Sequence, residues 1–129
     1  MDYDPYFTIA TIQHIPHSKA KRLLTTALEG GSNYWYTDLK VETLPPHTTK
    51  EDFQFWHTDL PFHPEGAISI AVAGEEGRHV LRLAKIAGGL QTLATRYTRH
   101  WNHFMNDNDD AATGDAFLQC CLFNDILFG

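Results

Sequence analysis

The sequence predicts an α+β fold: a small, mostly antiparallel sheet of about four strands, with three helices packed against it. Some stretches repeat apolar residues at steps of three and four, as helices do, and others alternate apolar with polar residues, as strands do. Glycine and proline pairs separate these stretches. The 129 residues are close to the commonest domain size and 43% are hydrophobic, so residues 1–129 are expected to form a single domain.

The chain is expected to begin with a strand and a helix. Residues 7–13 (FTIATIQ) are rich in β-branched and aromatic side chains and predict a strand, which Pro16 ends. Ser18 is the expected N-cap of a helix that continues to Leu28 and ends at the glycine pair of residues 30–31.

A second strand is expected over residues 33–42, where the hydrophobic period is two. The alternation places Trp35 on the inner face of this strand, and Tyr34 and Tyr36 on its outer face. Residues 45–66 contain prolines, histidines and large apolar side chains, so they predict a long loop that packs against the domain.

A hairpin and a long helix are expected next. Residues 67–73 and 79–83 flank a Gly-Glu-Glu-Gly turn and predict two antiparallel strands. Residues 83–104 carry apolar side chains at helical spacing and predict one continuous helix. Residues 88–89 are glycines inside this helix, where each costs roughly 1 kcal/mol relative to alanine, so another element is expected to approach closely there.

A last helix is expected near the end of the chain. Asp110 or Thr113 can cap its N-terminus, and it runs towards Asn124. The tail of residues 126–129 is apolar and is expected to dock on the domain.

The composition excludes several classes of partner. The formal net charge is -6, and an acidic domain repels the phosphate backbone, so general nucleic-acid binding is not expected. No apolar run approaches the roughly 20 residues of a membrane span, and the acidic start lacks the apolar segment of a secretory signal. The adjacent Cys120 and Cys121 do not suit an ordinary disulfide. A cytoplasmic protein is therefore expected.

Three segments resemble one family of proteins. Residues 26–36 (TALEGGSNYWY), 81–94 (LRLAKIAGGLQTLA) and 112–129 (ATGDAFLQCCLFNDILFG) are similar to a family of small uncharacterised bacteriophage and prophage proteins. The family has Gly where this chain has Asn124, and often Cys where it has Tyr36. The resemblance implies a phage-related gene expressed in the host cytoplasm. Small phage proteins often act against host defence, and some sequester nucleotide immune signals, so the resemblance implies such a role by analogy.

Residues 29–36 (EGGSNYWY) are the strongest candidate for a ligand site. The glycines let a second backbone or a ligand approach closely, and free N–H groups beside them can face an anion. Asn33 can read a base edge, and Tyr34 and Tyr36 can stack a base at about 1–3 kcal/mol. Trp35 belongs to the same candidate site, although burial in the core accounts for it better than a ligand role does.

A second candidate patch lies on the late helices. Arg96, Arg99 and His103 can clamp a phosphate group, because guanidinium groups match its geometry. Asp115 and Gln119 are one helical turn apart, so both can face a ligand. Whether this patch meets residues 29–36 does not follow from the sequence.

The sequence predicts no metal, no cofactor and no catalytic residues. His100 and His103 are three residues apart and could share a metal ion, but no HExxH or cysteine–histidine pattern accompanies them. The acidic run of residues 107–110 lacks the ligands that a calcium loop needs at later positions. Cys120 and Cys121 lie in an apolar helix, where a thiol is a poor nucleophile.

Three functions are compatible with these observations. The first is binding and sequestration of a nucleotide-derived immune signal without catalysis. The second is inhibition of a host protein through a flat aromatic surface. The third is hydrolysis of a nucleotide or related phosphate, with His57 or His63 acting together with Asp59. In each case a homo-oligomer is expected, because the outward tyrosines and the apolar tail need cover.

Overall fold

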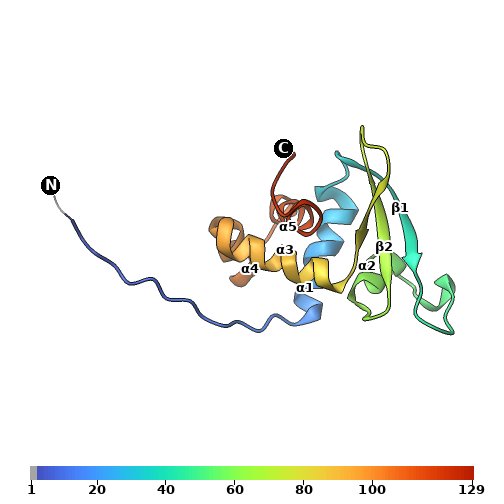
Figure 1. Ribbon diagram of the computed structural model, residues 1–129, viewed down its shortest axis with the longest axis horizontal. Helices are drawn as coiled ribbons and strands as arrows, with labels where there is room; N and C mark the ends of the chain where they lie inside the picture. The colour runs from blue at the N-terminus through green and yellow to red at the C-terminus, as the bar shows by residue number, and fades with distance from the viewer. Residues whose placement is uncertain (1–2) are drawn as a thin grey trace.

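The computed structural model describes residues 3–129 and has an α+β architecture (Figure 1). Within those residues it has five α-helices and a three-stranded sheet, so the predicted class is correct while the predicted four strands and three helices are not. The α-helices and strands are α1 (His17–Thr26), β1 (Tyr36–Thr43), α2 (Trp56–Asp59), β2 (Ala67–Val72), β3 (Arg78–Leu81), α3 (Leu83–Arg96), α4 (Thr98–Met105) and α5 (Ala111–Phe123). Three short helical turns accompany them, η1 (Ala27–Gly31), η2 (Lys50–Asp52) and η3 (Leu60–Phe62).

The sheet is antiparallel, with the strand order β1-β2-β3. The predicted hairpin is confirmed as β2 and β3, and the central strand β2 is almost wholly buried. The pairing of β1 with β2 shifts by one residue between Tyr36 and Asp38, which makes Thr37 a β-bulge. Because of this bulge Tyr36 packs against the core on the same side as Leu39 and Val41, and the predicted outward position of Tyr36 is wrong.

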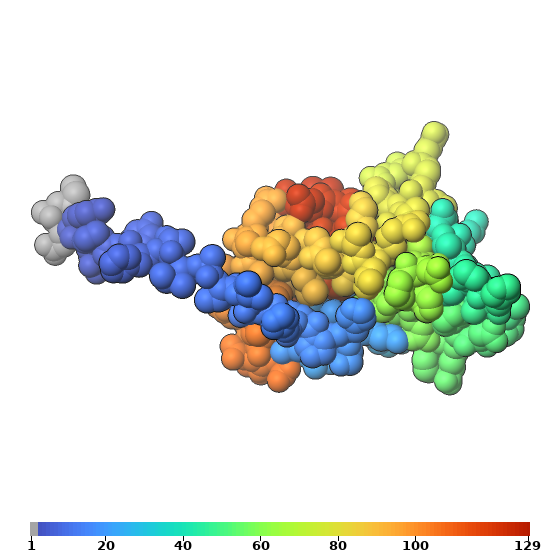
Figure 2. Space-filling model, turned by 60° about the horizontal axis from the view of Figure 1, so that its bottom comes forward, coloured from blue at the N-terminus to red at the C-terminus, as the bar shows by residue number. Residues whose placement is uncertain are grey.

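The predicted strand over residues 7–13 is also wrong. Residues 3–16 run as an extended arm that pairs with no strand, and Figures 1 and 2 show it leading away from the domain. Ile15, next to α1, packs against the core. Its side chains have the composition of a strand, but that composition stabilises a strand only when a neighbouring strand supplies hydrogen bonds and packing. We call residues 3–16 the arm.

The predicted long helix over residues 83–104 is two helices. The backbone of Tyr97 leaves the helical region, with φ -127° and ψ 62°, and so separates α3 from α4. The apolar spacing continues through this break because Tyr97, at the break, and Trp101, beyond it, both pack against the core. Apolar periodicity therefore could not locate the break.

The N-termini of α5 and α1 agree only in part with the prediction. Asp110 caps α5, because its Oδ1 accepts a hydrogen bond of 3.0 Å from the Thr113 N–H. The helix α1 begins two residues earlier than predicted, with Pro16 and not Ser18 at the N-cap position. Residues 45–66 pack against the domain as predicted, with Leu60 fully buried. They contain η2, α2 and η3, however, where the sequence predicts a loop.

Close helix packing accounts for one of the two mid-helix glycines. A Cβ atom at Gly89 would lie 2.3 Å from the Cys121 Sγ and 2.9 Å from the Cys121 Cα, so α3 and α5 touch at this point. A Cβ at Gly88 would meet nothing within 4 Å. The expected close approach is therefore confirmed at Gly89 alone.

The helices of residues 3–129 are all too short or too polar to cross a membrane. The prediction that the start of the chain lacks a secretory signal includes residues 1–2, which lie outside the described residues.

Candidate functional site

Asp115, on α5, binds the segment that precedes β1. Its Oδ1 accepts hydrogen bonds from the Ser32 hydroxyl at 2.8 Å and from the Trp35 indole N–H at 2.7 Å. Its Oδ2 accepts a hydrogen bond of 2.6 Å from the Tyr34 hydroxyl. The Gln119 amide, one turn further along α5, donates to Oδ1 at 3.1 Å. One carboxylate thus binds four donors from two distant parts of the chain.

Gln119 continues this network to the C-terminal tail. Its side chain is fully buried, and its Oε1 accepts hydrogen bonds from the N–H groups of Leu127 at 2.7 Å and Phe128 at 2.8 Å. Its Nε2 also donates to the Phe128 carbonyl at 3.2 Å. The Phe128 ring stacks on Trp35, with centroids 5.5 Å apart and planes 8° from parallel. The predicted docking of the tail is confirmed.

The structure therefore brings together four of the predicted site residues, Tyr34, Trp35, Asp115 and Gln119. Their polar groups bind one another, and Trp35 is buried at 2% exposure. Burial, with the Asp115 hydrogen bond, raises the pKa of Tyr34 to about 12, so this phenol stays protonated and donates at neutral pH. The ligand role predicted for these residues stays a prediction.

The other two residues of the predicted aromatic site lie apart from this network. Asn33 is exposed. Tyr36 is half-buried and its hydroxyl donates a hydrogen bond to the Leu28 carbonyl in η1. Gly31 permits the close approach that the sequence predicts, since a Cβ there would lie 2.6 Å from the Ala111 carbonyl oxygen. The second backbone at this point is the start of α5.

The predicted phosphate clamp is divided between two helices. Arg96, at the end of α3, donates to the Asn124 carbonyl at 2.9 Å and lies 3.3 Å from the Asp125 carboxylate. Arg99 is exposed and His103 half-buried on α4, beyond the break at Tyr97. Arg96 thus binds the start of the C-terminal tail, and Gln119 binds its end. Whether phosphate binds at these three residues stays a prediction.

No cluster of metal ligands is found among residues 3–129. His100, one of the two histidines considered for a metal, instead contacts Thr113 on α5, with its Nδ1 3.1 Å from the hydroxyl oxygen. Burial lowers the pKa of His100, partly offset by the nearby Asp110 carboxylate. Burial likewise raises the pKa of Cys120 to about 11, so this thiol is poorly reactive.

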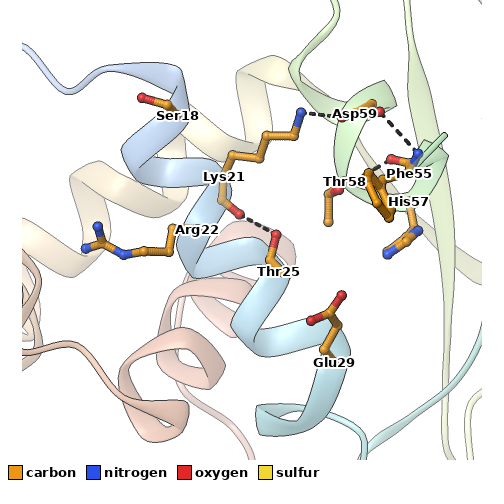
Figure 3. Close-up of a pocket in the computed structure, with 9 residues that line it drawn as sticks. All are labelled: Ser18, Lys21, Arg22, Thr25, Glu29, Phe55, His57, Thr58 and Asp59. Atoms are coloured by element: carbon orange, nitrogen blue, oxygen red, sulfur yellow. Dashed lines mark hydrogen bonds and ion pairs between the residues drawn. The ribbon is translucent and has the colours of Figure 1, made fainter. Parts of the chain in front are cut away.

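A groove of about 390 Å³ lies between α1 and α2, away from the Asp115 network. Figure 3 shows Lys21 reaching from α1 towards Asp59 on α2, with Thr25 further along α1 and Glu29 in η1, which follows it. Phe55, just before α2, lies at the groove with half of its surface exposed. The complete lining is Ser18, Lys21, Arg22, Thr25, Glu29, Phe55, His57, Thr58 and Asp59.

The charged groups of the groove are mostly paired. Lys21 forms an ion pair with Asp59, which also accepts a hydrogen bond of 3.3 Å from the Phe55 N–H. Arg22 points away from α2 (Figure 3) and pairs with Asp109 at 2.7 Å. Among the lining residues, Lys21 is therefore the cation best placed to meet a ligand in the groove.

Sequence reasoning identified part of this groove and missed the rest. Glu29 belongs to the predicted junction, and His57 and Asp59 belong to the hydrolase hypothesis. The other six lining residues were not predicted as site residues: Ser18, Lys21, Arg22, Thr25, Phe55 and Thr58. The available signal was a polar stripe that runs from α1 into η1, in which Ser18, Lys21, Thr25 and Glu29 recur at steps of three and four opposite the buried leucines.

Comparison of this chain with protein-family models, with curated proteins and with solved structures found no match.

Proposed function

We propose that this protein binds a small nucleotide-like ligand and holds it without chemical change, in the groove between α1 and α2. The observation that carries the proposal is the groove itself. Its volume of about 390 Å³ lies within the range of roughly 300–1,000 Å³ that is typical of small-molecule sites. The groove is lined by polar helix faces and one exposed aromatic ring.

The lining residues supply the three kinds of contact that a nucleotide needs. The Phe55 ring, 53% exposed, offers a surface on which a base can stack. The Lys21 ammonium group attracts a phosphate, which would share it with Asp59. The Glu29 carboxylate can accept hydrogen bonds from the amino group of a base. This combination favours the groove over the Asp115 network, in which the polar groups already bind one another.

The choice of ligand class also rests on the resemblance to small bacteriophage and prophage proteins. In that setting a nucleotide-derived immune signal of the host is the ligand whose removal would benefit a phage. Binding without turnover is enough for such a role, because a tightly bound signal no longer reaches its receptor. The proposed function is thus sequestration of this signal.

The proposal is tested by native mass spectrometry of the protein after incubation with a nucleotide extract of host cells. A stoichiometric small-molecule adduct is expected, and heat should release the molecule intact. Lys21→Met and Phe55→Ala should each weaken binding by about 10-fold. Lys40→Met and Phe7→Ala change the same residue types at exposed positions outside the groove and should leave binding unchanged.

The other outcomes each point elsewhere. Loss of binding in Asn33→Ala or Arg99→Ala, with the groove variants unaffected, would place the ligand at the sites first predicted from the sequence. Release of an altered molecule would favour the hydrolase hypothesis, whose His57 and Asp59 both lie at the groove. A spectrum without any adduct would contradict small-molecule binding.

Inhibition of a host protein is the second candidate function, and a specific feature favours it. The arm exposes Tyr3, Tyr6, Phe7, Ile9 and Ile12, each by 76% or more. Apolar surface of this extent needs a protein or another apolar partner to cover it. Pull-down from a host lysate with the full chain, and with Phe7→Asp/Ile9→Asp as control, tests this function.

A further inference from the structure

The arm is an unpaired strand by its sequence and its conformation. Residues 7–13 are extended, and residues 3–15 make no backbone hydrogen bond with the rest of the described chain. Successive side chains of an extended segment point to opposite sides, so Phe7 and Ile9 share one side. Phe7 is 94% exposed and Ile9 76% exposed. Both the backbone and this apolar side of the arm therefore lack a partner within residues 3–129.

The sheet has an open edge that lacks a strand. Within the described residues β1 pairs only with β2, so the hydrogen-bonding groups along its other edge have no strand partner. The strand at the opposite edge, β3, contacts α5. Leu39 and Val41 point to the core from β1 yet stay half-exposed, whereas Ile68 and Ile70, their partners on β2, are fully buried. The core side of β1 is therefore incompletely covered, and one more strand along this edge would cover it.

We infer that the arm of one copy of this chain adds a strand to the β1 edge of a second copy, and that the exchange is reciprocal. The side of the arm that carries Phe7 and Ile9 would extend the core next to Leu39 and Val41. Strand addition of this kind supplies main-chain hydrogen bonds together with burial of alternate side chains. A symmetric exchange satisfies both arms and both edges at once.

A second copy fits better than the chain's own sheet. Figures 1 and 2 show the arm leaving the domain on the side opposite to β1, so within one chain it runs away from the edge that it would complete. The charge of the arm also suits contact between two acidic chains. Residues 3–16 contain a single formal charge, at Asp4, although the whole chain carries -6. Contact through the arm therefore adds little charge repulsion.

The regular part of the β1 edge is short, which limits what can pair with it. Bulges at Thr37 and Glu42 leave residues 38–41 in regular register. Bulges and charged side chains such as Lys40 hinder indiscriminate pairing at an edge. A partner strand must therefore match this stretch closely, and the apolar pair Phe7 and Ile9 has the same spacing as Leu39 and Val41.

The test compares full-length variants by native mass spectrometry and by light scattering across a dilution series. The unchanged protein should be a dimer, and Phe7→Asp/Ile9→Asp should raise its dissociation constant by at least about 100-fold. Thr8→Asp/Ala10→Asp adds the same charge at the same spacing on the opposite side of the arm and should have a much smaller effect. Hydrogen exchange should be slowed by dimerisation at the amides of residues 7–13 and of β1.

Each contrary result overturns the inference. A monomer at every concentration contradicts the exchange. A dimer that is indifferent to Phe7→Asp/Ile9→Asp, or one more sensitive to Thr8→Asp/Ala10→Asp, rules out the proposed contact. Protection of the arm only after a host protein is added, with no dimer in the purified protein, assigns the arm to that host protein instead.

Discussion

The Tyr34 hydroxyl donates a hydrogen bond of 2.6 Å to Asp115, although the two residues are 81 positions apart in the chain. Asp115 also accepts hydrogen bonds from Ser32 and Trp35, so the whole turn that leads into β1 is attached to α5. Through Gln119 the same network holds the tail. Residues that resemble a ligand site in the sequence therefore connect three parts of the fold.

Asp115→Asn should lower the free energy of unfolding by about 2 kcal/mol. The amide keeps one accepting oxygen but replaces the other with a donor, which then faces a donor of the network. Urea denaturation followed by circular dichroism measures the change. Asp38→Asn is the matched control, because Asp38 forms an exposed ion pair with Arg78 and should cost less than about 1 kcal/mol. Equal losses in the two variants would show that the Asp115 network adds no stability of its own.

Gln119→Leu should release the tail and lower the free energy of unfolding by about 2–3 kcal/mol. Leucine is close in size to glutamine, but it leaves the N–H groups of Leu127 and Phe128 without their buried acceptor. Hydrogen exchange at these two amides should become much faster. Gln91→Leu, at an exposed position of α3, should leave their exchange unchanged. Slow exchange in Gln119→Leu would mean that stacking of Phe128 on Trp35 is enough to hold the tail.

Local sequence patterns predicted the structural features whose contacts are made between residues close together in the sequence. The hairpin of β2 and β3 and the N-cap of α5 depend on neighbouring residues. The hairpin was predicted correctly, and the cap, Asp110, is one of the two residues predicted for it. The strand predicted at residues 7–13 was wrong because a strand needs a partner, and no alternation of side chains shows whether one is present. The bulge at Thr37 shifted Tyr36 to the core side for a similar reason, since register depends on the pairing strand.

The candidate site could be predicted only in part, because its contacts join distant segments. Asp115 and Tyr34 were both singled out, each for a ligand, and nothing in the sequence showed that they bind each other. The groove combines a face of α1 with residues of α2, and Lys21 and Asp59, which meet there, are 38 positions apart in the chain. Its polar stripe on α1 is visible in the sequence, but such a stripe is also the usual appearance of a solvent-exposed helix face.

His100 should make stability depend on pH in the acid range. Burial lowers the pKa of His100 in the folded protein, so the folded state binds its proton less readily than the unfolded state does. Its contribution to stability is therefore present above the unfolded pKa of about 6.5 and is lost as the pH falls through the lower, folded pKa. Urea denaturation at a series of pH values should show a smaller acid loss in His100→Gln than in the unchanged protein.

The control for this experiment is His14→Gln on the exposed arm. It removes one histidine without touching the contact between His100 and Thr113. This variant should keep the pH dependence of the unchanged protein. If His14→Gln and His100→Gln behaved alike, the acid loss would come from groups other than His100.

The two glycines of α3 should respond in opposite ways to the same substitution. Gly89→Ala would place a methyl group 2.3 Å from the Cys121 Sγ and within 3 Å of the Cys121 backbone, which has no room to move without separating α3 from α5. It should lower the free energy of unfolding by about 2 kcal/mol or more. Gly88→Ala meets nothing within 4 Å and should raise it by up to about 1 kcal/mol, because alanine favours the helix. Thermal and urea denaturation of the two variants measure both changes, and a loss of stability in Gly88→Ala would mean that its open side is covered by another molecule in solution.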